Sequence, residues 1–442
     1  MHITFTILQV IIGAFFLLGI TYCFSEDKKS INWKLILSSI ILINIIFVLF
    51  RYVPFVNSGV NALSAGILGL LDYAHEGALF IFGDFANSQK YGFAFILTVV
   101  PTIIFFGALI GLLYFFGIIQ YLIAVLAYIL RKTVRLTGVE SMIVIADIFL
   151  GQSEGPLVIG PYIKTMSRSE LALAFTAGLA NLSGSTLGMY LMFLSNGDHV
   201  QSLVFANYLV TATFMNAISA IIFAKILFPE SLKKIAKDDN NDTGEFKVDL
   251  KSHRQANMLD SIVSGAMTGL KVGAAIVTVL LAVISLIHLL DGLLASLGNV
   301  LNLNQSITSS TNGVFSSLSI EYILGQIFRI FAFFMGITWS ETLNVGSLLG
   351  QKVAINEFVA YMSLGKMKLQ NVLSDSAIFT STFALASFSN FSSIGISLGV
   401  FSVLAPTRQK ELAGIAWKAF LGAVLAGFMT ASIAGLWHSI LG

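Results

Sequence analysis

Charged residues are scarce in this 442-residue chain, where Asp, Glu, Lys and Arg together make up 11%. Water-soluble domains carry about 25% charged residues, so this deficit excludes an ordinary soluble fold. The charges that are present nearly balance, at a net charge of +2, and no basic stripe runs along the chain. The sequence therefore argues against a nucleic-acid partner.

Cysteine is almost absent, and the single Cys23 can form neither an internal disulfide nor a cysteine-based metal site. A cleavable leader is not indicated either. The opening apolar segment 3–20 has no basic region before it and no small-residue cleavage site after Tyr22. We therefore expect this segment to be kept as the first helix.

Hydrophobic residues, by contrast, make up 56% of the chain and form long runs. A membrane-spanning helix needs about 20 apolar residues. The runs that reach this length, alone or with their flanks, are 35–50, 93–130, 203–228, 273–290, 394–404 and 416–441. They are too continuous for the strands of an outer-membrane barrel, which alternate lipid-facing and lumen-facing residues. The chain is predicted to be an all-α, multi-pass protein of the cell membrane, in contact with the lipid bilayer.

Basic residues cluster in a few loops, which the positive-inside rule places in the cytoplasm. The clusters are 28–34, 131–135, 233–254 and 408–410. The loops at 195–199 and 302–312 carry no Lys or Arg and fit the outside, whereas Lys366 and Lys368 also fall outside and strain the rule slightly. Following the chain through these loops predicts about eight transmembrane helices, with both termini outside.

The polar loop 233–253 divides the chain into halves that resemble each other. Leu-Gly-Gln-Ser-Glu at 150–154 precedes a Ser/Asn-rich stretch at 178–185. Leu-Gly-Gln-Lys at 349–352 leads through Asn356 and Glu357 to a similar stretch at 386–393. Because the first interrupted segment starts from the inside and the second from the outside, the repeat is inverted, as in secondary transporters whose broken helices meet near the bilayer midplane. We therefore expect two re-entrant helical hairpins besides the spanning helices.

The first hairpin carries two carboxylates in an apolar segment, 141–163, that is broken at Gly155–Pro156. Because proline removes a backbone donor, an unwound tip is predicted there. Asp147 and Glu154 are seven residues apart and would share a face wherever the helix persists. A charged carboxylate facing lipid is costly, so both are expected to face a wet or cationic site. The alternative is a structural ion pair with a basic residue at the membrane edge.

The second half offers Glu357 amid apolar neighbours, then Asn390 and Ser393 three residues apart. Carboxylates accept hydrogen bonds from hydroxyls, and amides match both donors and acceptors of a heterocyclic ring. These groups suit a neutral ligand with several hydroxyls. An anionic ligand would call for basic residues or helix N-termini at the site, and neither broken segment carries an Arg at its tip.

Five short motifs follow one another along the chain. They are Gly-Gln-Ser-Glu-Gly-Pro-Leu-Val at 151–158, Arg-Ser-Glu-Leu at 168–171, Asn-Glu-Phe-Val-Ala-Tyr at 356–361, Phe-Ser-Asn-Phe-Ser-Ser-Ile-Gly at 388–395 and Leu-Ala-Pro at 404–406. Together they resemble the signature segments of the concentrative nucleoside transporter family. The resemblance implies a cation-coupled nucleoside symporter, assembled as a homotrimer, whose transport domain moves like an elevator against a scaffold.

The resemblance also implies roles for individual residues. Those that match the family's nucleobase-reading positions are Gln152, Ser153, Glu154 and Thr186. Those that match its ribose pocket are Glu357, Phe388, Asn390 and Ser393. Ser153 stands where many members have Thr, and Thr186 where Val is common, so the base preference stays open.

The family's sodium site lies where the first hairpin meets the following helix. The corresponding side chains here are Asp147 and Asn181, with the carbonyls of Leu150 and Leu182. Asp147 replaces the family's usual Asn. A carboxylate can ligate sodium or carry a proton, so sodium is the expected coupling ion and a proton is the alternative.

The resemblance divides the chain into six expected parts. They are N-terminal helices and an interfacial helix of the scaffold (1–92), a long scaffold helix (93–135), the first hairpin and its following helices (136–229), a cytoplasmic polar loop (230–258), a second scaffold helix (259–300) and the second hairpin with its following helices (318–442).

Three other interpretations compete with a nucleoside symporter. A proton-driven transporter of another neutral polar metabolite would use the same architecture. A membrane-embedded enzyme would need a nucleophile with a base, or a metal triad, and no His lies in either broken segment. A passive channel fits inverted broken hairpins less well, because they suit an occludable site. No resident cofactor is expected besides the coupling ion.

Overall fold

The computed structural model describes residues 2–87, 90, 94–195, 198–230, 257–311 and 313–441, and their regular structure is helical throughout. The helices of the first half are α1 His2–Cys23, α2 Trp33–Tyr52, α3 Pro54–Phe82, η1 Gly83–Ala86, α5 Phe95–Phe115, α6 Ile118–Val134, α7 Gly138–Phe149, α8 Gly155–Val158, η2 Gly160–Tyr162, α9 Arg168–Ala180, α10 Gly184–Ser195 and α11 His199–Leu227. Those of the second half are α13 Met258–Val300, α14 Leu303–Ser310, α15 Ile320–Phe334, α16 Thr342–Ala354, α17 Glu357–Leu369, α18 Asp375–Leu385, α19 Phe391–Leu404, η3 Pro406–Arg408 and α20 Gln409–Leu441. The predicted cytoplasmic loop lies almost wholly outside the described residues.

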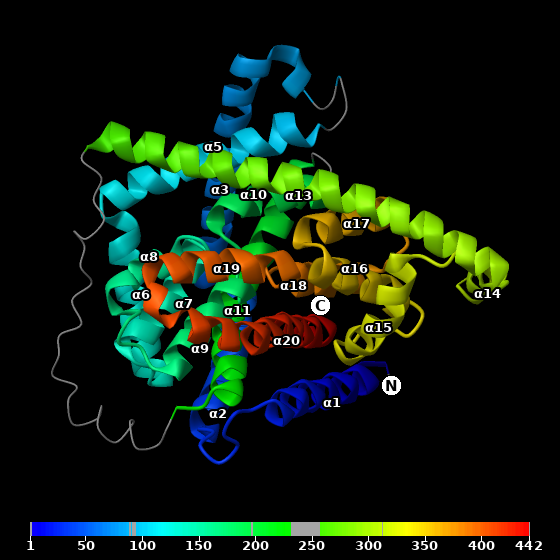
Figure 1. Cartoon of the computed structure of the whole chain (residues 1–442), viewed down its shortest axis with the longest axis horizontal. Helices are drawn as coiled ribbons and strands as arrows, with labels where there is room; N and C mark the ends of the chain where they lie inside the picture. The colour runs from blue at the N-terminus through cyan, green and yellow to red at the C-terminus, as the bar shows by residue number, and fades with distance from the viewer. Residues whose placement is uncertain are drawn as a thin grey trace.

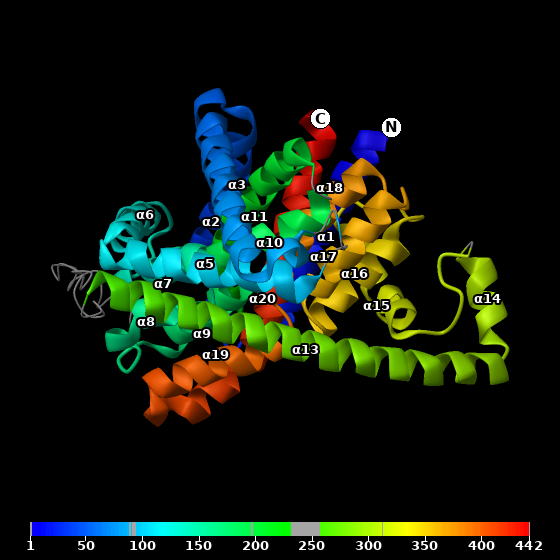
Figure 2. The same ribbon diagram turned by 90° about the horizontal axis from the view of Figure 1, so that it is seen from above.

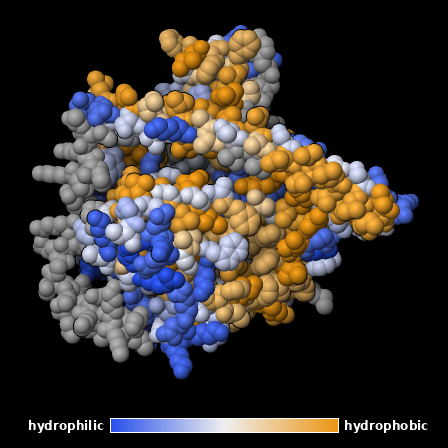
Figure 3. Space-filling model, viewed as in Figure 1, coloured by the Kyte–Doolittle hydropathy of each residue, from blue (hydrophilic) through white to orange (hydrophobic). Residues whose placement is uncertain are grey.

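Seven of the described helices are long and apolar enough to cross a membrane. They lie in α1, α2, α3, α5, α11, α13 and α20. Figure 3 shows a broad hydrophobic surface on the face that carries α13, and along this helix many leucines are exposed. Such a surface is stable against lipid and not against water. The predicted all-helical, multi-pass membrane fold is confirmed.

The two halves repeat one order of helices, which confirms the predicted repeat. Each half has a hairpin (α7 and α8, or α16 and α17), then a helix broken in the middle (α9 and α10, or α18 and α19), then one long helix (α11 or α20). Capping residues in the sequence set these starts. Thr137 and Ser167 form capping boxes at α7 and α9, and Asn390 caps α19. Figure 1 shows the hairpin and broken helices of both halves gathered around α11 and α20.

The long helix α13 packs along α5 on one side of this bundle, as Figures 1 and 2 both show. Both helices carry two glycines four residues apart, Gly107 and Gly111 on α5 and Gly265 and Gly269 on α13. A Cβ atom on any of the four would overlap backbone atoms of the other helix. Small residues at this spacing let membrane helices approach closely, so the four glycines define this contact.

One predicted segment differs from the structure. The stretch 93–135, expected as one long helix, forms α5 and α6, because Gly117 adopts a left-handed conformation (φ 78°) between them. The first two helices, expected in a scaffold with the rest of 1–92, pack on α11 and α20, and α2 also packs on α3. Asn44 of α2 accepts a hydrogen bond from Trp437 of α20 at 2.8 Å.

Several basic residues gather at one end of the bundle. Glu26, in the loop after α1, pairs with Arg168 at 2.9 Å and with Lys418 at 3.5 Å. The hydrogen bonds from the Arg168 guanidinium hold the pKa of Glu26 below its usual value. Arg408 donates to the carbonyl of Ile163 at this end. The N- and C-termini lie together elsewhere, since Thr6 and Ser439 line one cavity (Figure 2). The end with the basic residues is thus separate from the end with both termini. This agrees with the prediction that the basic loops face the cytoplasm and both termini face the outside.

Candidate functional site

The first hairpin is unwound between Phe149 and Gly155, directly before the predicted break at Gly155–Pro156, where a short helix begins. Helix α7 ends at Phe149, Gly151 has φ 73°, and the next helical turn begins at Gly155. Gly151 packs so closely on Ser183 and Phe388 that a Cβ there would lie 2.7 Å from Ser183 Cβ and 3.4 Å from the Phe388 ring. The tip therefore touches the break in α9 and α10 on one side and the break in α18 and α19 on the other.

Gln152 joins the hairpin tip of the first half to α19 of the second half. Its side-chain nitrogen donates to Ser393 Oγ at 3.1 Å, and its oxygen accepts from Ser397 at 3.2 Å. Gln152 and Ser393 are both buried. The structure thus brings together two predicted site residues that are 241 positions apart in sequence.

Glu357 begins α17 and lies buried between the two halves. Its Oε1 accepts a hydrogen bond from Tyr190 of α10 at 3.1 Å, and its Oε2 accepts one from Asn390 at 2.9 Å. Asn390 in turn accepts from the backbone nitrogen of Ser393 at 2.9 Å, which caps α19. The carboxylate is held in one place by groups from both halves.

Thr186 lies one helical turn before Tyr190 on α10, so it belongs to the same face of that helix. It is 3% exposed, and its hydroxyl contacts Ser183. The predicted residues Gln152, Thr186, Glu357, Phe388, Asn390 and Ser393 therefore surround one junction of the hairpin tips and the broken helices.

Ser153 and Glu154 face a cavity of about 330 Å³ between the first hairpin and the α5–α13 pair. Its other lining residues include Tyr114 of α5 and Ser261, Ser264 and Thr268 of α13. The spacing of Asp147 and Glu154 predicted a shared helical face. They do not share one, because α7 ends between them. The two carboxylates therefore serve different surroundings.

Asp147 is fully buried beside the last turn of α9. A Cβ atom on Gly155 would overlap Asp147 Oδ1, and one on Gly178 would lie 3.7 Å from Oδ2. Both carboxylate oxygens of Asp147 and both polar side-chain atoms of Asn181 lack a hydrogen-bond partner in the described chain. Buried oxygen atoms without a partner destabilise the fold, and such oxygens can bind a small cation or a proton. The donor set fits the cation site expected between Asp147, Leu150, Asn181 and Leu182.

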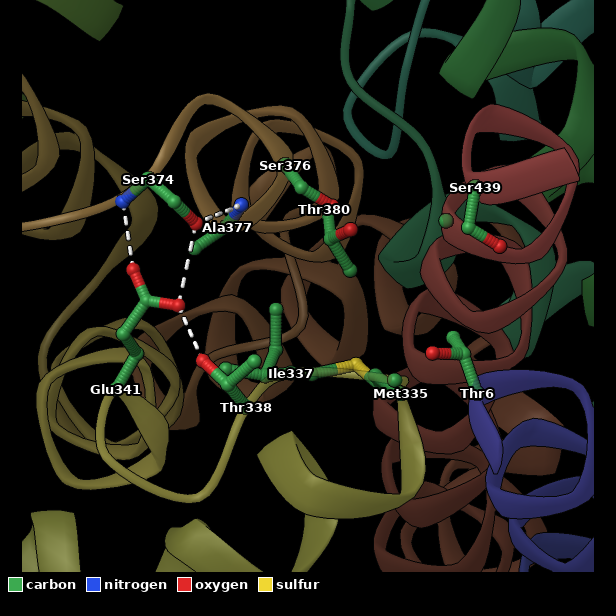
Figure 4. Close-up of a pocket in the computed structure, with 12 residues that line it drawn as sticks. Thr6, Met335, Ile337, Thr338, Glu341, Ser374, Ser376, Ala377, Thr380 and Ser439 are labelled. Atoms are coloured by element: carbon green, nitrogen blue, oxygen red, sulfur yellow. Dashed lines mark hydrogen bonds between the residues drawn. The ribbon is translucent and has the colours of Figure 1, made fainter. Parts of the chain in front are cut away.

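A second cavity, of about 310 Å³, lies elsewhere, at the end of the bundle where both termini meet (Figure 4). Its carboxylate, Glu341, already accepts hydrogen bonds from Thr338 and from the backbone and hydroxyl of Ser374. None of the residues predicted for the substrate lines it. The cavity thus lies at the starts of α16 and α18.

Sequence reasoning missed Tyr190 and the four glycines between α5 and α13. Tyr190 sits in the apolar run Gly188–Leu194, where a tyrosine is ordinary core. Its hydroxyl contact to Glu357 depends on tertiary packing. The glycine pairs had a usable signal, because a four-residue spacing of glycines occurs in two apolar segments.

Two inverted halves, each with a hairpin and a broken helix that meet at a buried polar site, define a membrane transporter of the secondary type. Models described as "Na+ dependent nucleoside transporter" N-terminus and C-terminus match residues 12–85 and 208–435, and one described as "Nucleoside recognition" matches 96–197. The chain belongs to the concentrative nucleoside transporter family.

Individual relatives agree with this membership. The chain is 33% identical to nucleoside permease NupC of Helicobacter pylori, over 98% of both chains. It is 31% identical to human solute carrier family 28 member 3, over 84% of this chain and 51% of the relative. The structure of CNTnw in an inward-facing substrate-bound state is similar with a TM-score of 0.86 at 32% identity, over 99% of both chains. A variant of CNTnw in an outward-facing state gives 0.87.

Proposed function

We propose that this protein is a symporter that carries nucleosides into the cell, driven by a cation gradient. The observation that carries the proposal is the placement of Glu357, whose two oxygens are held by Tyr190 and Asn390 at the junction of both halves. A carboxylate aimed in this way binds sugar hydroxyls, because each hydroxyl can donate to it. The name of the Helicobacter pylori relative and the descriptions of the matching models support a nucleoside as the cargo.

The proposed division of labour follows the two halves. Gln152, Ser153, Glu154 and Thr186 would read the nucleobase, since amide and hydroxyl groups match the mixed donors and acceptors of its edge. Glu357, Asn390 and Ser393 would hold the ribose, with Phe388 packing beside it. Gln152 now bonds to Ser393 and Ser397, and a base would replace these partners.

Sodium is the favoured coupling ion. The family description names sodium, and the unpaired oxygens of Asp147 and Asn181 offer it ligands. The chemistry that the ion supplies is neutralisation of the Asp147 carboxylate in a site of low dielectric. A proton on Asp147 would do the same, and this is the alternative. The transport cycle is proposed to use a homotrimer and elevator-like movement against α5 and α13, whose close packing suits a rigid support.

Equilibrium binding to the purified protein tests the cargo. Uridine, adenosine, uracil and uridine monophosphate should be measured as competitors of labelled uridine in the presence of sodium. We expect both nucleosides to compete with labelled uridine, and the free base and the nucleotide not to compete. The base lacks the ribose hydroxyls, and the nucleotide brings negative charge to a site rich in carboxylates. Competition by uracil equal to that by uridine would overturn the division between base and ribose contacts.

A further inference from the structure

Lys352, in the second hairpin, is fully buried, with 0% of its surface exposed. The other deeply buried lysine of the described chain, Lys225, contacts the carboxylate of Glu140. Lys352 has no such ion pair within the residues that the structure describes. Glu357 acts on the Lys352 ammonium electrostatically but forms no salt bridge with it. A buried ammonium without a salt-bridge partner is destabilising unless dipoles surround it, so Lys352 calls for a reason beyond packing.

The surroundings of the Lys352 ammonium are dipolar. Its nitrogen donates to the carbonyl of Ala384 at 2.9 Å and lies 5.7 Å from the centre of the Phe428 ring. Gly427 leaves the space for it, because a Cβ atom there would lie 3.2 Å from the nitrogen and 3.4 Å from Ser387 Oγ. Helices α16, α18 and α20 thus form a fitted seat for one cation.

This seat lies at the C-terminal end of α18, where the helix breaks. Carbonyls at a helix end lack intrahelical donors and carry partial negative charge. Side chains replace those donors here: Tyr361 donates to Thr382 O at 2.7 Å and Asn216 donates to Ala386 O at 2.5 Å. Lys352 is the charged member of this set. It is therefore the group that offsets the negative end of the broken helix.

By its place relative to the helix ends, Lys352 has a structural counterpart in the first half. This counterpart differs from Ser153, the residue opposite Lys352 in the Leu-Gly-Gln motif match, because α16 continues through this motif and α7 ends before it. Asp147 is the third residue from the end of α7, and Lys352 is the third from the end of α16. Each side chain lies against the last turn of the broken helix that follows, Asp147 at Gly178 and Lys352 at Ala384. In the first half the oxygens of Asp147 have no described partner. The position that calls for a cation in one half is thus filled by a covalently attached cation in the other.

We propose that Lys352 is a built-in cation that replaces, in the second half, the bound cation of the first half, and that it positions the substrate-binding segment 386–390. This inference rests on the proposed nucleoside function. Lys352 acts as a positioning residue: it holds the end of α18, from which the chain continues through Phe388 to Asn390, and Asn390 holds Glu357. One dissolved cation would then suffice to neutralise both broken helices.

Binding of labelled uridine to purified variants tests this. Lys352→Met keeps the apolar volume and removes the charge, and it should weaken uridine binding about tenfold or more. Lys352→Ala leaves space for an ammonium ion, so ammonium chloride should restore its uridine affinity toward the wild-type value. Choline chloride, which is too large for the seat, should not. Gly427→Ala keeps the lysine but crowds its nitrogen, and it should weaken binding by a smaller factor.

Lys418→Ala serves as the matched control, because this lysine pairs with Glu26 at the far end of α20. It should bind uridine like the wild type and ignore ammonium. Wild-type affinity in Lys352→Met would overturn the inference, and so would weak binding in Lys352→Ala that ammonium leaves unchanged, since a purely structural lysine predicts that result. Failure of the wild type to bind uridine would instead overturn the proposed function.

Discussion

Asn390 donates a hydrogen bond to Glu357 at 2.9 Å, although Asn390 caps α19 and Glu357 begins a different helix, α17. The same amide caps α19 through the backbone nitrogen of Ser393. One side chain therefore ties the start of a broken helix to the carboxylate proposed to hold ribose. A movement of the Glu357 carboxylate when substrate binds would therefore shift Asn390 and the start of α19.

Glu357→Gln should reduce the initial rate of uridine uptake about tenfold or more. The substitution keeps the size of the side chain but removes the charge, and with it a charge-assisted hydrogen bond worth about 1.5–3 kcal/mol. Uptake into cells should be measured alongside the amount of protein in the membrane. Tyr190→Phe, which removes one neutral donor to the same carboxylate, is expected to lower uptake by a smaller factor.

Glu154→Gln tests the other half of the site. Because Glu154 faces the cavity between the hairpin and the α5–α13 pair, its loss should lower uridine uptake by a similar factor. Uptake at the wild-type rate in both glutamine variants would show that neither carboxylate contacts the substrate.

Asp147→Asn distinguishes the two coupling ions. With sodium coupling, the amide supplies the family's usual ligand, so sodium-driven accumulation should persist with weaker ion affinity. With proton coupling, the change removes the titrating group, so uridine still binds while a pH gradient no longer drives accumulation. The readout is the accumulation ratio under each gradient. Ratios and ion affinity equal to wild type under both gradients would mean that Asp147 is structural.

Gly265→Leu should disrupt the contact between α5 and α13. A side chain at this position meets backbone atoms of Gly107, which cannot move aside as a flexible side chain would. We expect the free energy of unfolding in detergent to fall by about 1–3 kcal/mol, which is the usual cost of overpacking a core. Gly292→Leu on the same helix is the control, since nothing lies within 4 Å of a Cβ there. Equal stability of the two variants would contradict the assignment.

Lys225→Met should destabilise the protein by about 3–5 kcal/mol, because it leaves the buried Glu140 carboxylate without its partner. Lys418→Met removes a lysine from a partly exposed pair and should cost at most about 1 kcal/mol. Thermal unfolding of the two purified variants compares them. A smaller shift for Lys225→Met than for Lys418→Met would show that the buried pair contributes little.

The sequence was sufficient to predict the elements whose cause is local. Gly151 and Gly155–Pro156 interrupt an apolar segment, and the helix ends at Phe149 and starts again at Gly155. The recurrence of Leu-Gly-Gln in both halves predicted the repeat of hairpin and broken helix. Both signals depend on backbone chemistry and on the scarcity of polar groups in a membrane segment, so they are visible without tertiary structure.

Tertiary packing decided the rest. The break at Gly117 was not predicted because an isolated glycine is tolerated in an apolar helix. Asp147 and Glu154 were expected on one face, but the end of α7 at Phe149 separates them. The contact of Tyr190 with Glu357 joins residues 167 positions apart, which no local pattern encodes.

The central claim is that a cation gradient drives nucleoside accumulation through this site, and gradient-driven uptake by the purified protein tests it most directly. Proteoliposomes should be given an inward sodium gradient or an inward proton gradient, each imposed separately, and the internal labelled uridine compared with that outside. The account predicts accumulation above the outside concentration under one gradient, most strongly with sodium, and its loss in Glu357→Gln. Uridine that merely equilibrates under both gradients, or accumulation that Glu357→Gln leaves intact, would contradict it.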